Sequence, residues 1–503
     1  MRADEQPVLI GVGQQTWREQ GSAGTPADAL QTVAQRALDD SRSHDVRNAI
    51  DAIVHVPFIL NQVDALRDAM PSNMGTALAQ RLGISASQYS ADVGGNLPQH
   101  LVNAMAGRLV RGEHSVVLLC GVELLATFLG AVRGGAGFPE WDSGSGGAPL
   151  SLVQTPGMTT PTEQAHGLFE PTNAYPLFES ALRHAKGLAV EAHAERLGRL
   201  ISTLSEVAVA NPYAWKPRRY ATNEVLSTDN RNRMICHPYT KVMNSIIAVD
   251  QAAAVIMTTA RRARELGVDA SRCIYLRGGA GAHDTWYLSE RQDLHRSPAL
   301  GVAARAALQQ AGLGIDEMDC FDIYSCFPSA IQIACDEIGI AIDDERGLTV
   351  TGGMSLFGGP GNNYSLHALV SLVERLRELP GGKGLLSANG GYLTKHAVGV
   401  YAREPGDSPW QPLDEAPLQA QVDALPTRDV ADEGSGVLTV EAHTVKYKGE
   451  SPDEALLLGQ LNDGKRCVAV SRDEAVIEAF LRDDCVGLVG TVEHRAGQNH
   501  FQL

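Results

Sequence analysis

The 503-residue chain lacks the features of several specialised protein classes. It has no apolar run of about 18 residues, so no membrane-spanning helix is predicted. Residues Met1 to Ile10 have neither the basic start nor the apolar run of a secretion signal. The eight cysteines include no C-x-x-C pair, which argues against a zinc or disulfide framework. We therefore expect a cytoplasmic protein that holds no metal or other resident cofactor.

Positive charge is also scarce. Lys and Arg total 42 against 59 Asp and Glu, the formal net charge is -17, and no lysine- or arginine-rich run occurs. Nucleic-acid binding needs a basic face, so no nucleic-acid partner is expected. An anionic ligand would have to be met by a local site.

What the chain does have is enough length for two or three domains and a repeated pattern. Segments typical of strands and helices alternate from Val8 to Cys120 and again from Cys273 to Ala388, including a strand from Cys320 to Tyr324. Matching landmarks keep a nearly constant offset: Gly339 with Gly83 (339 − 83 = 256) and Leu386 with Leu119 (386 − 119 = 267). This pattern predicts an α/β fold made of two similar halves with mostly parallel strands.

Composition changes along the chain predict its domain organisation. We expect an N-terminal half at 1–270 with an insertion at about 124–243, a second half at 271–405, a linker at 406–430 and an additional domain at 431–503. The insertion, glycine-rich from Gly134 to Gly147, could cover a site. Proline with acidic residues marks the linker. Short strands with one helix and a turn at Ala496-Gly497 favour an OB-like barrel at the end.

Four stretches in order carry a family resemblance. They are Arg111 to Glu123, Asn244 with Asp250 to Ala254, Gly352 to Pro360, and Asn389 to Gly391 with Lys395 to Tyr401. They resemble the Gly-x-Glu turn, the Asn...Asp-Gly-Ala-Ala-Ala stretch, the Gly-Gly-Ala-x-x-x-Gly-His-Pro loop and the final glycine loop of the thiolase superfamily. The likeness is strongest to sterol-carrier-type thiolase-like proteins that carry an additional C-terminal domain. The resemblance implies a duplicated thiolase fold, two βαβαβαββ halves in α-β-α-β-α layers, and a coenzyme A thioester as substrate or ligand.

The residues that thiolases use for acyl transfer are replaced in this chain. By the family's spacing, the cysteine nucleophile falls on Gly95 and its activating histidine on Gly359. The second catalytic cysteine falls on Ser387 or Ala388, and a serine that touches the coenzyme A arm falls near Ile246. Glycine cannot form an acyl-enzyme. The resemblance therefore implies no acyl transfer through cysteine, and we expect a pocket widened by two missing side chains.

Tyr324, in Tyr324-Ser325-Cys326-Phe327, stands at the family's Asn-Glu-Ala-Phe position and is the first candidate catalytic residue. Its hydroxyl would bind a thioester carbonyl or act as acid or base if its pKa, about 10 when unperturbed, were lowered. The alternative is a tyrosine packed under the loop. Cys326 as a nucleophile and His367 as a histidine reaching the cavity are further candidates, each with a buried core role as the alternative. His396 is expected to be structural.

The backbone offers candidate binding groups. The loops at Gly94-Gly95 and Gly358-Gly359 each precede a helix, whose free N–H groups bind a carbonyl oxygen or an anion. The predicted substrate-binding residues are Gly95, Asn96, Gly359, Asn389 and Gly390. Three functions remain open. The first is an enzyme, acyltransferase-like or aldolase-like, that makes or breaks a carbon-carbon bond in an acyl-CoA. The second is a non-catalytic protein that binds acyl-CoA or lipid, and the third is a subunit that recruits a partner through the C-terminal domain. For assembly, a homodimer and a partner subunit bound through the C-terminal domain are both open.

Overall fold

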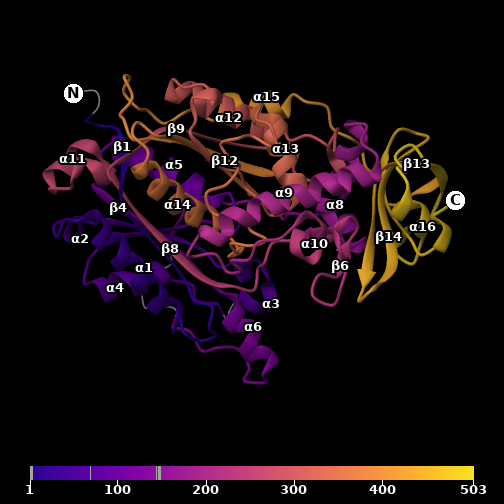
Figure 1. The fold of residues 1–503 in the computed structure, drawn as a ribbon, viewed down its shortest axis with the longest axis horizontal. Helices are drawn as coiled ribbons and strands as arrows, with labels where there is room; N and C mark the ends of the chain where they lie inside the picture. Colours follow the sequence, from indigo (N-terminus) through magenta and orange to yellow (C-terminus); the bar gives the residue numbers. More distant parts are fainter. Residues whose placement is uncertain (1–3, 68–69, 143, 145–148) are drawn as a thin grey trace.

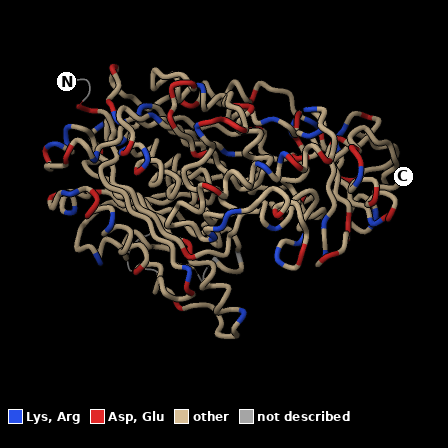
Figure 2. The backbone as a smooth tube through the Cα atoms, in the orientation of Figure 1, with Lys and Arg blue, Asp and Glu red and all other residues tan. Residues whose placement is uncertain are grey.

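The computed structural model describes residues 4–67, 70–142, 144 and 149–503 (Figure 1). Part of the glycine-rich stretch of the predicted insertion, at 143 and 145–147, lies outside the described residues, as do the first three residues of the segment tested for a secretion signal. No helix among the described residues is long and apolar enough to cross a bilayer. Lys, Arg, Asp and Glu lie mainly on outer helices and loops, whereas the strands of the large sheet are almost free of charge (Figure 2).

The first half is built on five strands. They are β1 (Pro7–Thr16), β2 (Ala52–Val56), β3 (Ser87–Ser90), β4 (Val116–Leu124) and β8 (Asp250–Thr259). β2 runs parallel to β3 and β4, and β8 pairs antiparallel with β4 and β1. Every residue of β4 and β8 is buried, because helices cover both faces of these strands.

The second half repeats this arrangement. Its strands are β9 (Ile274–His283), β10 (Cys320–Asp322), β11 (Lys383–Gly390) and β12 (Lys395–Ala402). β10 runs parallel to β11, and β12 pairs antiparallel with β11 and β9, so the order β10-β11-β12-β9 matches β2-β4-β8-β1. The halves join where β9 meets β1 at two residue pairs. The predicted duplication is confirmed, but the expectation of mostly parallel strands is wrong, because β8 and β12 each pair antiparallel with both of their neighbours.

Helices form the layers around the strands. They are α1 (Pro26–Ser41), α4 (Met74–Leu82), α5 (Leu97–Val110), α12 (Pro298–Ala311), α13 (Pro328–Ile338) and α14 (Tyr364–Glu378). α5 and α14 contact each other and strands of both halves, which makes them the central layer. α1 packs on strands of the first half and α12 on strands of the second. The central pair brings the start of α5 close to the start of α14.

The insertion is mostly helical. It contains α6 (Leu125–Arg133), β5 (Leu150–Ser151), α7 (Pro161–Ala165), α8 (Pro171–Ala185), α9 (Val190–Ala210), α10 (Thr222–Leu226), β6 (Met234–Cys236) and β7 (Tyr239–Thr240). β5 pairs with β3 and becomes the outermost strand of the ten-stranded sheet. α8 packs against α13 on one side and against the C-terminal region on the other. Short helices complete the first half: α2 (Val46–Ala49), α3 (Asp64–Arg67) and α11 (Ala260–Glu265).

The C-terminal region is a small closed β domain, as predicted. Its elements are β13 (Ser435–Lys448), β14 (Ser451–Leu461), β15 (Arg466–Ser471), α16 (Glu474–Arg482), β16 (Val489–Arg495) and β17 (Gln498–Gln502). The pairing β13-β14-β15-β17-β16 closes on β13, and β6 of the insertion adds to β13. That this barrel is OB-like stays a prediction. The predicted linker contains a helix, α15 (Ala416–Asp423), because Pro417 lies in the first turn, where a missing N–H costs no hydrogen bond.

A buried arginine fastens this domain to the rest of the chain. Arg466 on β15 donates hydrogen bonds to the carbonyl oxygens of Arg291 and Gln292 and pairs with Glu441 at 2.8 Å. Asn499 donates its backbone N–H to His166 of the insertion at 2.8 Å. These hydrogen bonds fasten the β domain, which lies beside α8 at the end of the molecule away from the N-terminus (Figure 1).

Candidate functional site

The loop before α5 leaves no free space at Gly95. A Cβ atom at this position would lie 2.0 Å from the hydroxyl oxygen of Tyr324 and 2.6 Å from the carbonyl oxygen of Asn389. Both distances are far below van der Waals contact, so only glycine fits. The Tyr324 hydroxyl therefore fills the space that a side chain at residue 95 would take.

At Gly359, too, a hydroxyl from another segment fills the space that a side chain would take. Its Cβ would lie 2.0 Å from Oγ of Ser245, a buried hydroxyl with no hydrogen-bond partner among the described residues. The expectation of a widened pocket is thus wrong at Gly95 and at Gly359, because the hydroxyl of Tyr324 occupies the space beside the first glycine and the hydroxyl of Ser245 that beside the second. Ser245 directly precedes Ile246, the residue near which the position of the family's coenzyme A-contacting serine falls. Ile246 instead accepts a hydrogen bond from the Gly359 backbone N–H at 2.8 Å.

Asn362 and Glu123 hold the two loops together. The Gly94 N–H donates to Oδ1 of Asn362 at 2.9 Å, and the Ile59 N–H donates to Oε1 of Glu123 at 2.7 Å. Glu123 packs against Gly361, whose Cβ would lie 2.2 Å from the carboxylate. Burial raises the pKa of Glu123 to about 8, so this carboxyl is protonated at neutral pH.

Tyr324 follows the end of β10, which stops at Asp322 and not at Tyr324 as expected. The strand ends early because Asp322 turns its carboxylate to Val350 and Thr351. The Tyr324 N–H donates to Oγ of Ser387, while its hydroxyl has no hydrogen-bond partner in the described part of the chain. Burial, with the nearby Cys326, raises the pKa of Tyr324 well above its usual value of 10. The condition of a lowered pKa is not met, and the phenol is neutral.

Cys326 lies beside the same groups. Nδ2 of Asn389 donates to its sulfur at 3.8 Å and to the Tyr175 hydroxyl at 3.0 Å. Burial raises the pKa of Cys326 to about 12, so the thiol is protonated near neutral pH, the form that is a poor nucleophile. The structure thus brings Gly95, Tyr324, Cys326 and Asn389 together, while their catalytic roles stay predictions.

His367 lies in another environment. Its Nδ1 is 3.0 Å from Oε1 of Gln14 on β1, and its ring packs on Phe357 with centroids 5.5 Å apart. Burial lowers its pKa to about 3, so the imidazole is neutral. None of its contacts among the described residues is with Tyr324, Gly95 or Asn389.

Asn96 and Gly390 are neighbours, since a Cβ at Gly390 would lie 2.3 Å from Oδ1 of Asn96. Lys395, which sequence reasoning missed, lies over the same loop and donates from Nζ to the Val93 carbonyl at 2.7 Å. Burial lowers the pKa of Lys395 to about 8. A lysine next to His396 at the start of a strand whose later residues carry no charge was the available signal.

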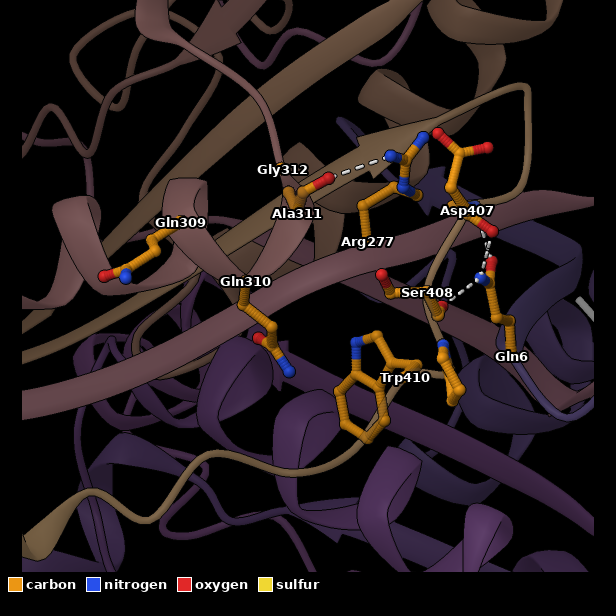
Figure 3. A pocket seen from close by; sticks show the side chains of 11 residues that line it. Gln6, Arg277, Gln309, Gln310, Ala311, Gly312, Asp407, Ser408 and Trp410 are labelled. Atoms are coloured by element: carbon orange, nitrogen blue, oxygen red, sulfur yellow. Dashed lines mark hydrogen bonds between the residues drawn. The ribbon is translucent and has the colours of Figure 1, made fainter. Parts of the chain in front are cut away.

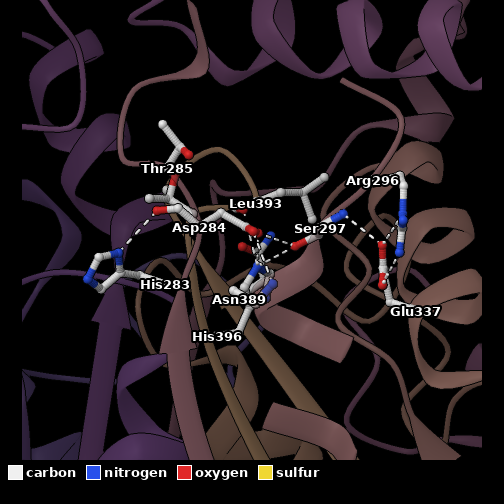
Figure 4. Close-up of polar contacts among 12 residues, drawn as sticks. His283, Asp284, Thr285, Arg296, Ser297, Glu337, Asn389, Leu393 and His396 are labelled. Carbon is white, nitrogen blue, oxygen red and sulfur yellow. Dashed lines mark hydrogen bonds and ion pairs between the residues drawn. The ribbon is translucent and has the colours of Figure 1, made fainter. Parts of the chain in front are cut away.

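A buried polar network completes the site (Figure 4). Nε2 of His396 lies 2.8 Å from Oγ of Ser297, which donates to Oδ2 of Asp284 at 2.5 Å. Burial alone would raise the pKa of Asp284, but hydrogen bonds from His396 and Ser297 and the charge of Arg291 hold it below its usual range. Sequence reasoning treated His396 as structural and missed its partners, which are 112 and 99 residues away (396 − 284 and 396 − 297).

Two cavities are relevant. One, of about 10 Å³, is lined by Tyr324, Ser387, Asn389 and His396 and has room for about one water molecule. The other, of about 200 Å³, lies at the end of α12 between Arg277, Gln310 and Trp410 and shares no lining residue with the first (Figure 3). The described residues contain no group of His, Cys, Asp or Glu that could hold a metal ion.

Comparisons with known proteins agree with this architecture. A family model of a thiolase C-terminal domain-like region matches residues 280–360, and one of the additional C-terminal domain of thiolase-like protein type 1 matches residues 417–496. The solved structure of a monomeric SCP2-thiolase-like protein type 1 from Mycobacterium smegmatis is 32% identical, with 100% of both chains covered and a TM-score of 0.84. The fold and sequence together define a thiolase-like protein. More particularly, the chain belongs to the SCP2-thiolase-like proteins of type 1.

More distant relatives share parts or the fold alone. The Ltp2-ChsH2(DUF35) aldolase is 16% identical at a TM-score of 0.60 over 80% of this chain and 99% of that chain. The acetyl-CoA acetyltransferase of Methanothermobacter thermautotrophicus is 29% identical over 165 residues, 33% of this chain and 41% of that protein. The 3-ketoacyl-CoA thiolase of Salmonella heidelberg is 31% identical over 168 residues, 30% of this chain and 36% of that protein. The chain thus spans about two fifths or less of the length of these curated relatives.

Proposed function

We propose that the protein binds an acyl-CoA thioester between the Gly95 and Gly359 loops and makes or breaks a carbon-carbon bond without a cysteine intermediate. The observation that carries the proposal is the Tyr324 hydroxyl, 2.0 Å from the Cβ position of Gly95 at the start of α5. A neutral phenol at this point can donate to a thioester oxygen, while the positive end of the α5 dipole stabilises developing negative charge. The names of the relatives, an acetyl-CoA acetyltransferase and an aldolase, support the same substrate class and chemistry.

A cationic segment beside Gly359 suits the phosphates of coenzyme A. Backbone N–H groups of Trp215 and Lys216 donate to Phe357 and Leu356 at 2.8 and 2.9 Å, so this segment lies along the loop. The side chains of Lys216, Arg218 and Arg219 are exposed. Arg218 pairs with Glu224 at 2.7 Å and Arg219 with Glu206 at 3.9 Å, so Lys216 carries the positive charge of this segment that no carboxylate balances among the described residues. This charge is available to an anionic ligand on a protein with a net charge of -17.

The test measures binding and turnover separately. Calorimetry with acetyl-CoA should give a 1:1 complex, and a panel of 3-oxo- and 3-hydroxyacyl-CoAs should give product. Tyr324→Phe should remove turnover and keep binding. Charge reversal at Lys216 and Arg219 should weaken binding of the coenzyme A ester about tenfold or more, and leave binding of the matching pantetheine ester, which lacks the nucleotide phosphates, unchanged. Absence of any acyl-CoA binding would refute the proposal.

A non-catalytic acyl-CoA or lipid-binding protein is the second candidate. The raised pKa values of Tyr324 and Cys326 favour it, since neither group is ionised at neutral pH. Binding of acyl-CoA without product from any member of the panel would favour this function over the first.

A role as a subunit is the third candidate. Val437 and Val489 are 38% and 57% exposed on the barrel strands β13 and β16, which pair with each other, and they offer an apolar contact to a partner. A homodimer through the β3 edge of the large sheet would have to displace β5, which is already paired there. Pull-down with the full chain and light scattering test the two arrangements.

A further inference from the structure

The hydroxyl of Tyr175, on α8 of the insertion, is bound to the turn at residues 391–394 between β11 and β12. It donates to the Gly391 carbonyl oxygen at 2.9 Å and accepts from the Leu393 N–H at 3.3 Å. It also accepts from Nδ2 of Asn389 at 3.0 Å. A phenol has one hydrogen to donate and two lone pairs, so these three bonds use its full capacity. Tyr175 is 2% exposed, and solvent water therefore does not compete for them.

The turn at residues 391–394 needs such a fastening. Gly391 and Leu393 both have a positive φ, at 70° and 54°. Glycine adopts this left-handed conformation freely, whereas leucine does so at a cost and only where the surrounding contacts hold it. The turn also borders the candidate site, because the carbonyl oxygen of Asn389 lies 2.6 Å from the Cβ position of Gly95. A shift of the turn would therefore move a group that contacts the Gly95 loop.

The other half of α8 is bound to the β domain. Oγ of Ser180 accepts from the His443 N–H of β13 at 2.9 Å. The side chain of Arg183 is 7% exposed and pairs with Asp484 at 3.0 Å. Tyr175 and Arg183 are eight residues apart (183 − 175 = 8) on one helix, which is about 12 Å along its axis. α8 therefore connects the β domain with the turn (Figure 1).

A second connection reaches the same turn. Arg291 donates from Nη2 to Oγ1 of Thr394 at 2.9 Å. The carbonyl oxygen of Arg291 accepts from the buried side chain of Arg466 on β15. Its guanidinium also lies 5.5 Å from the ring centre of Phe178 on α8. Two separate contacts of the β domain thus lead to residues 391–394.

We propose that the β domain is a positioning domain, which holds the 391–394 turn against the Gly95 loop through Tyr175 of α8 and through Arg291. Tyr175 is a positioning residue, because it acts on the site through the turn and Asn389. The catalytic consequence rests on the proposed function, whereas the positioning itself does not. Misplacement of a site group by about 1 Å slows turnover by up to about 10²-fold, so loss of these contacts lowers kcat more than it raises KM.

Amide hydrogen exchange tests the positioning without a substrate. Deuterium uptake of the peptide that contains residues 391–394 is read by mass spectrometry in the full-length protein. Tyr175→Phe removes the acceptor of the Leu393 N–H, so uptake there should become about tenfold faster. Ser180→Ala combined with Arg183→Met removes two side-chain contacts of α8 with the β domain, and should speed uptake of the same peptide by about three- to tenfold.

Arg199→Met is the matched control. Arg199 is also an arginine of the insertion with a carboxylate partner, but it pairs with Glu195 of its own helix, α9, at 2.6 Å. It should leave uptake at the level of the unmodified protein. Equal uptake at residues 391–394 in Arg199→Met and in the Ser180/Arg183 double variant overturns the role of the β domain.

Two further variants make the result independent of one substitution. Equal uptake in Arg199→Met and Tyr175→Phe overturns the role of Tyr175. Arg466→Ala breaks the second connection and should also speed uptake at residues 391–394, and unchanged uptake in this variant overturns the connection through Arg291. Circular dichroism establishes that each variant is folded.

Turnover tests the catalytic consequence. With an acyl-CoA that the unmodified protein converts, Tyr175→Phe and the Ser180/Arg183 double variant should lower kcat about tenfold and leave KM within about twofold. A raised KM with unchanged kcat overturns the catalytic role, because the contacts then serve binding. Absence of turnover by the unmodified protein refutes the proposed function instead, and the exchange data alone then decide whether the β domain holds the turn.

Discussion

Substitution of Gly95 by alanine tests the central contact of the site. The added methyl group would lie 2.0 Å from the Tyr324 hydroxyl, 2.8 Å from Cζ of the same ring and 2.6 Å from the Asn389 carbonyl oxygen. To reach ordinary contact at 3.4 Å, the hydroxyl has to retreat by about 1.4 Å (3.4 − 2.0). The Tyr324 ring is packed edge-on against Tyr364, and Asn389 belongs to a buried strand, so neither moves freely. Overpacking of this kind costs about 1–3 kcal/mol, and the rigid carbonyl places Gly95→Ala at the upper end.

The assay is urea denaturation of four proteins: the unmodified chain, Gly95→Ala, Tyr324→Phe and the double variant. Removing the hydroxyl removes the shortest contact but leaves those at 2.6 and 2.8 Å, so the double variant should recover part of the loss, with a coupling of about 0.5–3 kcal/mol. Gly157→Ala is the control, since nothing lies within 4 Å of its Cβ position, and it should change stability by less than about 0.5 kcal/mol. If Gly95→Ala is as harmless as Gly157→Ala, the placement of Tyr324 is wrong.

Further predictions concern a carboxyl, a thiol and an arginine. Because Glu123 has a pKa of about 8 when folded against 4.5 ordinarily, its contribution to stability is complete below pH 4.5 and is lost as the pH rises through 8. Between pH 5 and pH 9, the free energy of unfolding should therefore fall by a few kcal/mol more in the unmodified protein than in Glu123→Gln. An equal pH dependence of the two proteins would contradict this. Since the pKa of Cys326 is about 12, iodoacetamide at pH 8 should alkylate this thiol only when urea unfolds the protein. Mass spectrometry reads the labelling, and rapid labelling of Cys326 in the native protein would show that the thiol is not buried. Arg466→Ala should cost about 1–3 kcal/mol by removing the donor to the carbonyl oxygens of Arg291 and Gln292, whereas Glu441 keeps its ion pair with Arg428 at 2.8 Å. It should also make the β domain the first site of proteolysis, and an unchanged digestion pattern would argue against the fastening role.

Much of the fold was readable from local patterns. Continuous apolar runs such as Val116 to Leu119 predict strands covered on both faces, and β4 is buried throughout. Thr25 is a residue type that commonly caps helices, and its side chain accepts from the Asp28 N–H at the start of α1. The nearly constant offset of landmarks such as Gly83 with Gly339 and Leu119 with Leu386 predicted the duplication. The two glycines end α4 and α13 in the left-handed conformation that favours glycine.

Element ends and side-chain environments were less accessible. The strand expected to reach Tyr324 ends at Asp322, since a buried carboxylate needs hydrogen-bond donors and finds them in the segment around Thr351. Proline composition favoured an irregular linker, yet a helix starts at Ala416, because proline is tolerated in a first turn. Local composition does not report which partner a polar group finds.

The sequence by itself determined the class of fold, the absence of cysteine at Gly95 and of histidine at Gly359, and the order of the glycine loops, because each of these is a property of residue type and local spacing. Only the tertiary structure decided that Tyr324 and Ser245 fill the spaces beside those glycines and that His396 meets Ser297 and Asp284. These contacts join residues about 100 to 230 positions apart, and their geometry follows from strand register and from the packing of two halves against each other. No pattern within a single segment encodes it.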